Sequence, residues 1–370
     1  MQSKFNLMNK DKVVLVFSIN RNPYSLNFNI DCILANDLIP LSLKSGFYDL
    51  RQWIESRYIL AYRVDTEKFL LTLGISNIED FITITKCVSL NDTFWVKPLD
   101  SKVSWKAVSP YRNPINKAIS DYSFTSKLEN KNIGSSPDFS TDGNFPKCWK
   151  RKGNSIYLLK AGTSGAFNAG YEPYSEVFAY QLEKYLGLNA LEYRLVNHKG
   201  VDASKCKSLC SEEVGLISLK QYKNIVNTDF EWLVNNFNCK YIHEMLLIDY
   251  LLCNIDRHFG NIWIFVNNDS QKVIDFTPLG DNNLSCIPYY VSDEDLYYYI
   301  DDIRAKDGRT WLELLSLVDK NIAIKMISKA SNFNFSSLGN KRADKRVPII
   351  NKMLRYQINR AKKYLTSQEK

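Results

Sequence analysis

The stretch Asn254 to Asn261, which reads Asn-Ile-Asp-Arg-His-Phe-Gly-Asn, places a carboxylate, Asp256, five positions before the carboxamide of Asn261. Two further carboxylates, Asp275 and Asp281, follow later in the chain. A carboxylate can position an attacking hydroxyl, while an amide oxygen and a second carboxylate suit Mg²⁺. Phosphoryl transfer asks a protein mainly for positioning and charge neutralisation. The pattern therefore indicates phosphoryl transfer from a nucleotide.

The loop also has an ordinary explanation, because Asp and Asn are both common in turns. The charged group Asp256-Arg257-His258, however, lies between a strongly apolar helix expected over 240–253 and an apolar strand. An uncompensated charge is costly between such elements, and clusters of this kind are often sites. We therefore favour a functional loop, in which His258 has a structural role: it packs or orients Asp256 or a backbone carbonyl.

A lysine and a glutamate lie upstream in the order that a kinase lobe requires. Lys160 ends a strand-like stretch, and Glu176 lies in the first turn of an amphipathic helix expected over 173–186. In two-lobed kinases such a lysine binds the nucleotide phosphates and the glutamate holds the lysine. Each alone has a simpler explanation, a solvated strand end for Lys160 and a helix-dipole partner for Glu176. Their order before Asp256 favours the kinase interpretation.

A loop that covers the phosphates should precede Lys160, but the pattern G-x-G-x-x-G is absent. The nearest candidate runs from Ser140 to Lys147 and reads Ser-Thr-Asp-Gly-Asn-Phe-Pro-Lys. Its backbone amides at Gly143, its hydroxyls at Ser140 and Thr141, and the Lys147 ammonium can together cradle phosphate. An ordinary polar turn explains the same residues equally well.

Two carboxylates compete for the second magnesium position. Asp275 lies near the end of a strand expected over 272–276, and Asp281 lies in the turn 278–283 that follows. A loop beyond a strand directs its oxygens into a cleft more freely than the strand does, which favours Asp281 over Asp275.

These segments together resemble the HipA-like serine/threonine kinases of bacteria. Residues 254–261 resemble the N-x-D-x-H-x-x-N loop of that family, in which Asp-Arg-His replaces the His-Arg-Asp order of eukaryotic-type protein kinases. Residues 278–281 resemble its P-x-x-D segment, and residues 140–147 its S-x-x-G-x-x-x-K phosphate loop. The resemblance covers about residues 135 to 330.

The resemblance implies an ATP- and Mg²⁺-dependent kinase and assigns roles by position. It implies Asp256 as the catalytic aspartate, Asn261 and Asp281 as magnesium ligands, and Lys160 as the ATP-binding lysine with Glu176 as its partner. It further supports Asp281 over Asp275.

The family also implies partners and a modification. Many members are toxin components paired with a DNA-binding antitoxin, and some autophosphorylate a phosphate-loop serine, whose counterpart is Ser140. The chain departs from the pattern at Gly280, where an aromatic residue is common, and its N-terminal region is only loosely similar. Toxin status and partner binding stay open on these residues.

The expected fold is α+β and two-lobed, like that of protein kinases, with a β-rich N-lobe and a mainly helical C-lobe. Along the chain we expect a β-rich N-terminal subdomain over 1–108 and a linker or long loop over 109–136, which is rich in Ser, Asn, Pro and Lys. The kinase N-lobe would cover 137–220 and the helical C-lobe 221–370. A strand is expected at 13–17, helical structure over 43–60 and a hairpin over 149–160 turning at Gly153-Asn154.

Composition narrows the class of protein without naming a substrate. The 370 residues are 45% hydrophobic and 24% charged, with a net charge of +8 that permits phosphate-bearing partners but does not demand nucleic acid. Eight scattered cysteines and three histidines make no zinc pattern and fit a reducing compartment. The N-terminus lacks an apolar signal segment, and the longest apolar run is too short to span a bilayer. We therefore expect a cytoplasmic location.

These observations favour an ATP- and Mg²⁺-dependent serine/threonine protein kinase acting on a protein substrate. An antitoxin or regulatory partner follows from the resemblance, and no direct nucleic-acid binding or membrane association is expected. Two alternatives stay open: a lipid or small-molecule kinase on the same scaffold, and an ATP-binding pseudokinase without turnover.

Overall fold

The computed structural model describes residues 2–22, 24–58, 70–71, 73–127, 134–141, 145–291 and 295–367. Contacts within the chain divide it into two compact units. The first comprises Met1–Lys160, Lys207–Ile225 and Trp263–Thr277, and the second comprises Ala161–Cys206, Val226–Ile262 and Pro278–Lys370.

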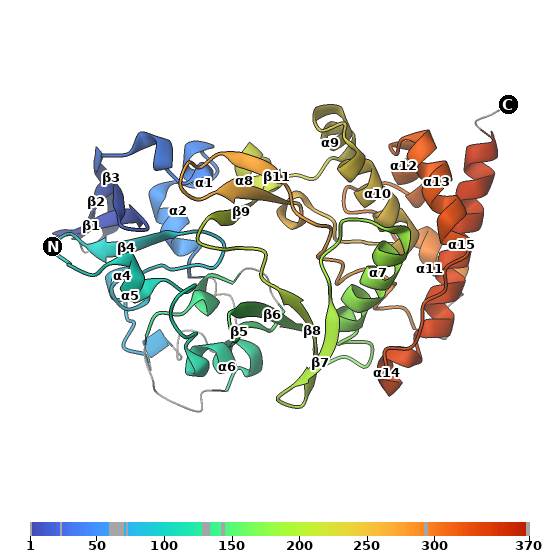
Figure 1. Ribbon diagram of the computed structural model, residues 1–370, viewed down its shortest axis with the longest axis horizontal. Helices are drawn as coiled ribbons and strands as arrows, with labels where there is room; N and C mark the ends of the chain where they lie inside the picture. The colour runs from blue at the N-terminus through green and yellow to red at the C-terminus, as the bar shows by residue number, and fades with distance from the viewer. Residues whose placement is uncertain are drawn as a thin grey trace. The chain divides into compact units, whose positions relative to one another are not determined.

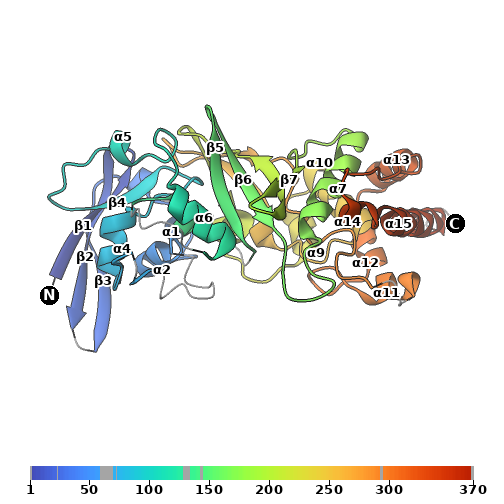
Figure 2. The same ribbon diagram turned by 90° about the horizontal axis from the view of Figure 1, so that it is seen from below.

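The first unit begins with an antiparallel sheet in the order β3-β2-β1-β4 (Figure 2). Its strands are β1 (Gln2–Asn9), β2 (Lys12–Asn22), β3 (Ser25–Ile33) and β4 (Phe94–Pro98). β2 contains the expected strand 13–17, and its buried Phe17 lies opposite Phe5 of β1. Successive side chains of a strand point to opposite faces, so this pairing directs both rings into one core.

Short helices complete that core. They are α1 (Leu41–Lys44), α2 (Leu50–Glu55) and α4 (Ile78–Thr85), and Trp53 and Phe81 from the last two pack with Phe17. The helical structure expected over 43–60 is therefore two short helices in the part described. The break between them has a local cause, because Gly46 adopts a φ of 75° and Asp49 caps the next helix through a capping box with Gln52.

Part of the segment 109–136, expected as a linker or long loop, is helical. After α5 (Trp105–Val108), α6 covers Lys117–Thr125. Asn116 caps α6 by accepting a hydrogen bond from the Ile119 amide at 3.2 Å, and Ile119 and Tyr122 are buried in the core. The buried run from Ile119 to Phe124 includes polar side chains, so the composition of this stretch does not reveal that it is packed.

The expected hairpin is confirmed as β5 (Lys147–Lys152) and β6 (Ser155–Ala161), with Gly153 in the turn at a φ of 58°. A second antiparallel sheet of the first unit has the order β11-β10-β9. The remaining elements of this unit are β9 (Val214–Ser218), α8 (Leu219–Lys223), β10 (Trp263–Asn267), β11 (Val273–Phe276) and 3-10 helices at Asn36–Leu38 and Pro137–Ser140.

The second unit opens with α7 (Glu172–Leu186) and the antiparallel pair β7 (Arg194–His198) and β8 (Val201–Lys207). The helix expected over 173–186 is confirmed, and it stops at Gly187, whose φ of 77° is the left-handed conformation that favours glycine.

Helix α10 (Lys240–Leu252) lies at the centre of the helical body and contacts α9, α12, α13 and α15 (Figure 1). Its residues from Met245 to Leu252 are all buried, and Asp249 is the charged residue among them. The other elements are α9 (Phe230–Asn236), a 3-10 helix at Phe259–Asn261, α11 (Leu296–Asp302), α12 (Trp311–Ser316), α13 (Lys320–Ala330), α14 (Lys341–Asp344) and α15 (Val347–Ser367).

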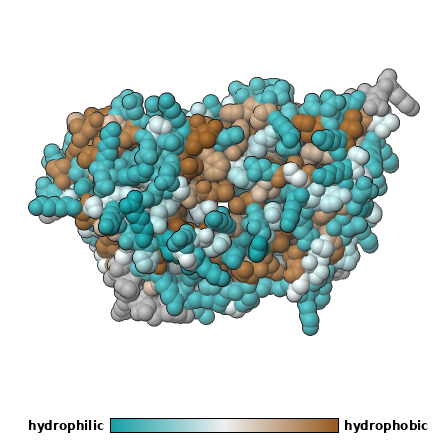
Figure 3. Space-filling model, viewed as in Figure 1, coloured by the Kyte–Doolittle hydropathy of each residue, from teal (hydrophilic) through white to brown (hydrophobic). Residues whose placement is uncertain are grey.

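Hydrophilic residues cover most of the face drawn in Figure 3, with hydrophobic residues scattered among them. Such scattering is usual for folded proteins and needs no special explanation. Among the described residues, no helix has both the length and the apolar character that crossing a bilayer requires.

Candidate active site

The loop 254–261 begins where α10 ends. Cys253 closes the helix in a left-handed conformation, with a φ of 52°, and turns the chain out of the core. Asn254 then stabilises the turn from both sides. Its Nδ2 donates to Oδ1 of Asp249 at 2.8 Å, and its Oδ1 accepts the amide of Asp256 at 3.1 Å. The buried helix thus determines where Asp256 leaves the core.

Arg257 connects this loop to the loop that carries Asp281. Its Nε lies 2.9 Å from Oδ2 of Asp249, its Nη1 donates to the carbonyl of Gly280 at 2.8 Å, and its Nη2 donates to Oδ1 of Asn282 at 2.7 Å. Nη1 also contacts the carbonyl of Asn261 at 3.3 Å. One planar side chain therefore sets the spacing of two loops that are about twenty residues apart in sequence.

Burial and pairing act in opposite directions on the pKa of each member of this pair. Burial raises the pKa of Asp249, and the Arg257 guanidinium opposes that rise. Burial lowers the pKa of Arg257, but the Asp249 carboxylate more than offsets it, so the pKa of the guanidinium is raised overall. The Asp281 carboxylate also contributes to raising the pKa of Arg257.

Asp256 presents its two carboxylate oxygens to different partners. Its Oδ1 lies 2.6 Å from Nζ of Lys306, and its Oδ2 lies 4.0 Å from Nε2 of His258. Nδ1 of His258 accepts the amide of Gly260 at 3.0 Å, so in the neutral ring Nε2 carries the proton. His258 therefore organises the backbone and faces Asp256, the structural role expected for it.

Asn261 and Asp281, the two expected magnesium ligands, are each held by a hydrogen bond in the structure. Nδ2 of Asn261 donates to the carbonyl of Asp256 at 3.0 Å, which leaves its amide oxygen as the atom suited to a cation. Asp281 adopts a φ of 58°, and its amide donates to the hydroxyl of Tyr193 at 3.4 Å.

Asn282 joins this arrangement to helix α7. Its amide donates to Oε2 of Glu176 at 2.8 Å, and its Nδ2 donates to Oε1 of Glu183 at 2.9 Å. Burial raises the pKa of Glu183 to about 8, while Arg257 and the Asn282 side chain act in the opposite direction. Glu176 thus has a defined contact with the Asp281 loop, whatever its role towards Lys160.

Sequence reasoning missed Glu183, Asn282 and Lys306. A signal existed for Glu183, which lies seven residues after Glu176 and so on the same helical face, among apolar residues. The side-chain contacts of Asn282 and Lys306 arise from tertiary packing, and their local sequence context carries no comparable signal.

In the described part of the chain, no group of three or more His, Cys, Asp or Glu side chains is arranged to bind a metal ion. Mg²⁺ is commonly bound through one or two protein side chains together with water and phosphate oxygens. The amide oxygen of Asn261 and the carboxylate of Asp281, on two tethered loops, are a donor set of that kind.

Comparison with solved structures places this arrangement in a known fold. HipA of Shewanella oneidensis MR-1, solved in a toxin–antitoxin complex with HipB and operator DNA, is 13% identical, covers 98% of both chains and has a TM-score of 0.53. The chain has a HipA-like kinase fold. No family model and no curated protein sequence matches it.

Two further kinases show weaker likeness. The proinflammatory kinase CtkA of Helicobacter pylori is 17% identical, with 62% of this chain and 93% of that chain covered and a TM-score of 0.47. The Golgi casein kinase is 11% identical, with 61% and 72% covered and a TM-score of 0.29. The HipA-like fold confirms the α+β, kinase-like class expected from the sequence.

In the HipA-like fold of this chain, the two lysines expected to bind phosphate are neighbours. Lys147 of β5 and Lys160 of β6 are directly paired across the hairpin, so their side chains leave the same face. Like charges in this position are unfavourable on their own. Lys160 and Lys147 belong to the first unit, whereas Asp256, Asn261 and Asp281 belong to the second.

The expected phosphate-loop hydroxyls point to protein atoms. Ser140 is 7% exposed and donates to the carbonyl of Pro137 at 3.0 Å. Thr141 is similarly buried and accepts a hydrogen bond from Nε1 of Trp149 at 3.0 Å. Gly143 lies outside the described residues. Phosphate binding through these two hydroxyls therefore requires that they exchange their present partners.

Asp275, the alternative to Asp281, lies in β11 of the first unit. It is exposed, and its Oδ1 accepts the amide of Phe276 at 2.7 Å. Asp281, in contrast, shares a loop with two direct partners of Arg257, the Gly280 carbonyl and the Asn282 side chain.

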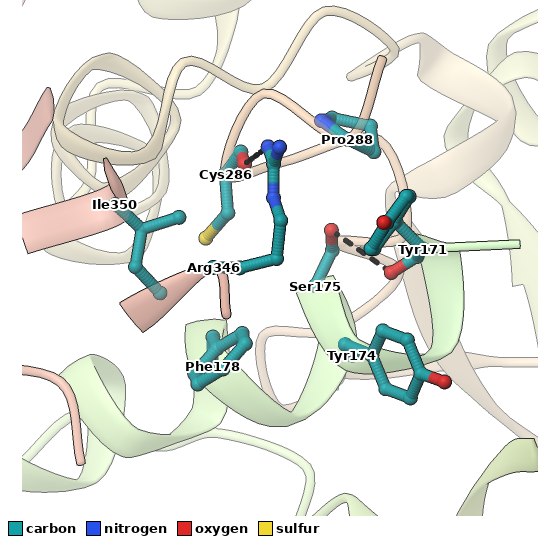
Figure 4. Close-up of a pocket in the computed structure, with 8 residues that line it drawn as sticks. All are labelled: Tyr171, Tyr174, Ser175, Phe178, Cys286, Pro288, Arg346 and Ile350. Atoms are coloured by element: carbon teal, nitrogen blue, oxygen red, sulfur yellow. Dashed lines mark hydrogen bonds between the residues drawn. The ribbon is translucent and has the colours of Figure 1, made fainter. Parts of the chain in front are cut away.

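A small cavity of about 10 Å³ lies between α7 and the start of α15 (Figure 4). It has room for about one water molecule. Arg346 already donates to the carbonyls of Tyr290, Cys286 and Ile287, so its charge is not directed at a ligand. The cavity is lined by Tyr171, Tyr174, Ser175, Phe178, Cys286, Pro288, Arg346 and Ile350.

A larger cleft of about 380 Å³ lies in the first unit, beside the turn of the β5–β6 hairpin. Two of its basic side chains are already engaged. Lys150 lies 2.8 Å from Oδ1 of Asp121, and Nη2 of Arg151 donates to the carbonyls of Pro110 and Tyr111. The residues that line it include none of those expected to bind nucleotide.

Proposed function

We propose that this chain is an ATP- and Mg²⁺-dependent protein kinase that phosphorylates serine or threonine. One observation carries the proposal. Arg257 binds Asp249 at the end of α10 and also binds the backbone and side chain of the Asp281 loop. This arrangement connects the loop that carries Asp256 and Asn261 to the loop that carries Asp281, which supports their assignment as general base and magnesium ligands.

Asp256 would receive the substrate hydroxyl. Its carboxylate leaves the core on a turn that Asn254 stabilises, and His258 faces its second oxygen. A carboxylate held in this way orients the hydroxyl towards the phosphorus and accepts its proton as the new bond forms.

Asn261 and Asp281 would bind Mg²⁺ through their side-chain oxygens. The ion, when bound, neutralises charge on the nucleotide phosphates. Arg257 supports both ligands, since it contacts the carbonyl of Asn261 and that of Gly280, the residue before Asp281.

Lys160 and Lys147 would bind the phosphates of ATP. Their direct pairing across the hairpin supports this role, because both side chains leave the same face of the strand pair. Ser140, Thr141 and Gly143 would complete a loop over the phosphates. The partnership of Glu176 with Lys160 stays a prediction.

A toxin role and an antitoxin partner form a further part of the proposal. The likeness to HipA covers 98% of this chain, and that protein was solved together with HipB. Co-purification of the chain with the product of a neighbouring reading frame would test this part separately from catalysis.

The test of catalysis compares wild type with Asp256→Asn, Asp281→Asn and Asp275→Asn. Labelled ATP is supplied with protein extract, with lipids or with a metabolite pool, and melting temperatures check that each variant is folded. We expect transfer to Ser and Thr of protein, a loss of roughly 10²–10⁴-fold in the Asp256 variant and a comparable loss in the Asp281 variant.

The Asp275→Asn variant is the matched control and should retain transfer. Equal loss in the Asp275 and Asp281 variants would contradict the assignment of the metal ligand. Transfer to lipids or metabolites instead of protein supports the small-molecule alternative, and nucleotide binding without any transfer supports a pseudokinase.

A further inference from the structure

Lys306 contacts the proposed catalytic aspartate directly. Its Nζ lies 2.6 Å from Oδ1 of Asp256, although 50 residues separate the two in sequence. The lysine belongs to the connection between α11 and α12, which no sequence pattern assigned to the site.

The backbone that presents Lys306 is a tight and well-anchored turn. The amide of Ala305 donates to the carbonyl of Arg309 at 3.0 Å, and the amide of Gly308 donates to the carbonyl of Ala305 at 2.9 Å. Gly308 adopts a φ of 87°, which only glycine takes readily. Asp307 accepts the amide of Phe230 and so attaches the turn to α9. The position of Lys306 is therefore built into the fold.

The other cations of this connection have partners elsewhere. Arg304 donates to the carbonyls of Asp301 and Asp302. Arg309 binds the carboxylates of Asp307 and Glu231. Lys306 is thus the cation of the turn that is directed at Asp256.

Stability does not explain the contact. The side chains of Lys306 and Asp256 are 43% and 23% exposed, and an ion pair in contact with solvent contributes little to folding because water and salt screen it. A flexible ammonium group beside a general base is, however, well placed to meet a phosphate oxygen.

We propose that Lys306 is a further catalytic residue that contacts the phosphoryl group during its transfer. This inference rests on the proposed kinase function. Before the reaction, its ammonium holds one oxygen of Asp256. During the reaction, it donates to an oxygen of the phosphoryl group and stabilises the charge there.

The step balances without any further reactant. The substrate hydroxyl oxygen forms a bond to the γ-phosphorus, and the bond between that phosphorus and the bridging oxygen to the β-phosphate breaks. ADP leaves with the electron pair of the broken bond. The hydroxyl proton passes to Asp256, and Lys306 stays protonated throughout.

The test uses Lys306→Ala and Lys306→Arg, with Lys325→Ala on the exposed face of α13 as the matched control. For each protein, kcat and the KM for ATP are measured. Calorimetry measures the affinities for Mg²⁺–ADP alone and with aluminium fluoride, an analogue of the phosphoryl group in the transition state.

We expect Lys306→Ala to lower kcat roughly 10- to 100-fold with little change in the KM for ATP. It should bind Mg²⁺–ADP like wild type but lose most of the additional affinity that aluminium fluoride confers. Lys306→Arg should recover part of both losses, because it keeps a cation at the site. Lys325→Ala should match wild type in every measurement.

Three outcomes would overturn the inference. A faster reaction in Lys306→Ala would mean that the lysine blocks Asp256. An unchanged kcat together with unchanged aluminium fluoride binding would mean that the contact is incidental. A wild type that transfers no phosphate would contradict the kinase proposal itself, and this inference with it. The second outcome differs, because there the wild type is active and only this inference is contradicted.

Discussion

Arg257 and Asp249 form an ion pair in which Nε lies 2.9 Å from Oδ2 and neither side chain is more than 3% exposed. The aspartate belongs to the last turn of α10, and the arginine lies beside Asp256 in the loop that follows. The remaining donors of the guanidinium bind Gly280 and Asn282. The pair thus fixes the proposed general base relative to the Asp281 loop.

Breaking this pair is expected to cost much more than breaking an exposed one. Arg257→Met leaves the Asp249 carboxylate buried without its cation, and we expect a loss of about 3–5 kcal/mol in the free energy of unfolding, measured in urea. The free energy of unfolding of Arg257→Lys should lie between those of wild type and Arg257→Met, since a single ammonium cannot replace the planar guanidinium.

Arg51→Met is the control, because Arg51 pairs with Glu55 on the exposed side of α2. We expect it to change the free energy of unfolding by about 0.5 kcal/mol or less. Equal midpoints for Arg257→Met and wild type would show that the buried pair does not stabilise the fold.

The raised pKa of Glu183 predicts that the stability of the protein depends on pH. Burial raises its pKa from the ordinary value of 4.5 to about 8, so the folded protein keeps a proton that the unfolded chain releases. The stabilising contribution of that proton is complete below pH 4.5 and is lost as the pH rises to 8. Glu183→Gln keeps an oxygen for Asn282 and has no proton to release.

The difference in unfolding free energy between Glu183→Gln and wild type should therefore grow in favour of the variant between pH 4.5 and 8. Urea denaturation at several pH values measures it, and the exposed Glu192→Gln variant controls for the substitution itself. A difference that is constant with pH would show that Glu183 is ionised throughout this range.

Gly280 stands where the sequence resemblance leads us to expect an aromatic residue, and Tyr193 and Leu191 lie beside it. A Cβ at Gly280 would lie 3.4 Å from the hydroxyl of Tyr193 and 3.5 Å from Cβ of Leu191. We expect Gly280→Ala to change the free energy of unfolding by less than about 1 kcal/mol, and Gly280→Phe to cost about 1–3 kcal/mol through overpacking.

A double-mutant cycle of Gly280→Phe and Tyr193→Ala tests whether Tyr193 causes the destabilisation. If it is, Gly280→Phe should cost less when Tyr193 is alanine, and the coupling energy from the four proteins should be clearly non-zero. Additive effects would mean that some other neighbour excludes the aromatic ring.

Ser140 is expected to resist a negative charge in its present conformation. Its hydroxyl donates to the carbonyls of Pro137 and Val88 in a buried site, and these carbonyl oxygens would repel a carboxylate or phosphate there. Ser140→Asp should open the segment 134–141, seen as faster amide exchange, whereas Ser140→Ala should lose only about 1 kcal/mol. Unchanged exchange in Ser140→Asp would show that the segment accommodates the charge.

Much of the local structure followed from the sequence. Turn residues at Gly153-Asn154, the stop at Gly187 and the apolar runs of β2 and α10 act through neighbours along the chain. Such signals can be read from the sequence without any knowledge of the fold. Helix α6 was missed because its apolar positions are sparse and acquire meaning only from the core that covers them.

The residues of the candidate site also fall into those that the sequence indicated and those that only the fold revealed. The sequence by itself indicated the candidate residues, Asp256 and Asn261 in one loop and Asp281 in the turn 278–283, because the pattern within each segment is local. Tertiary structure decided what surrounds them. Lys306, Asn282 and Glu183 lie 26 to 73 positions from Asp256 in the sequence, and their contacts arise from the packing of α7, α10 and the α11–α12 turn. A sequence records which charges a chain carries, but only folding determines which of them meet.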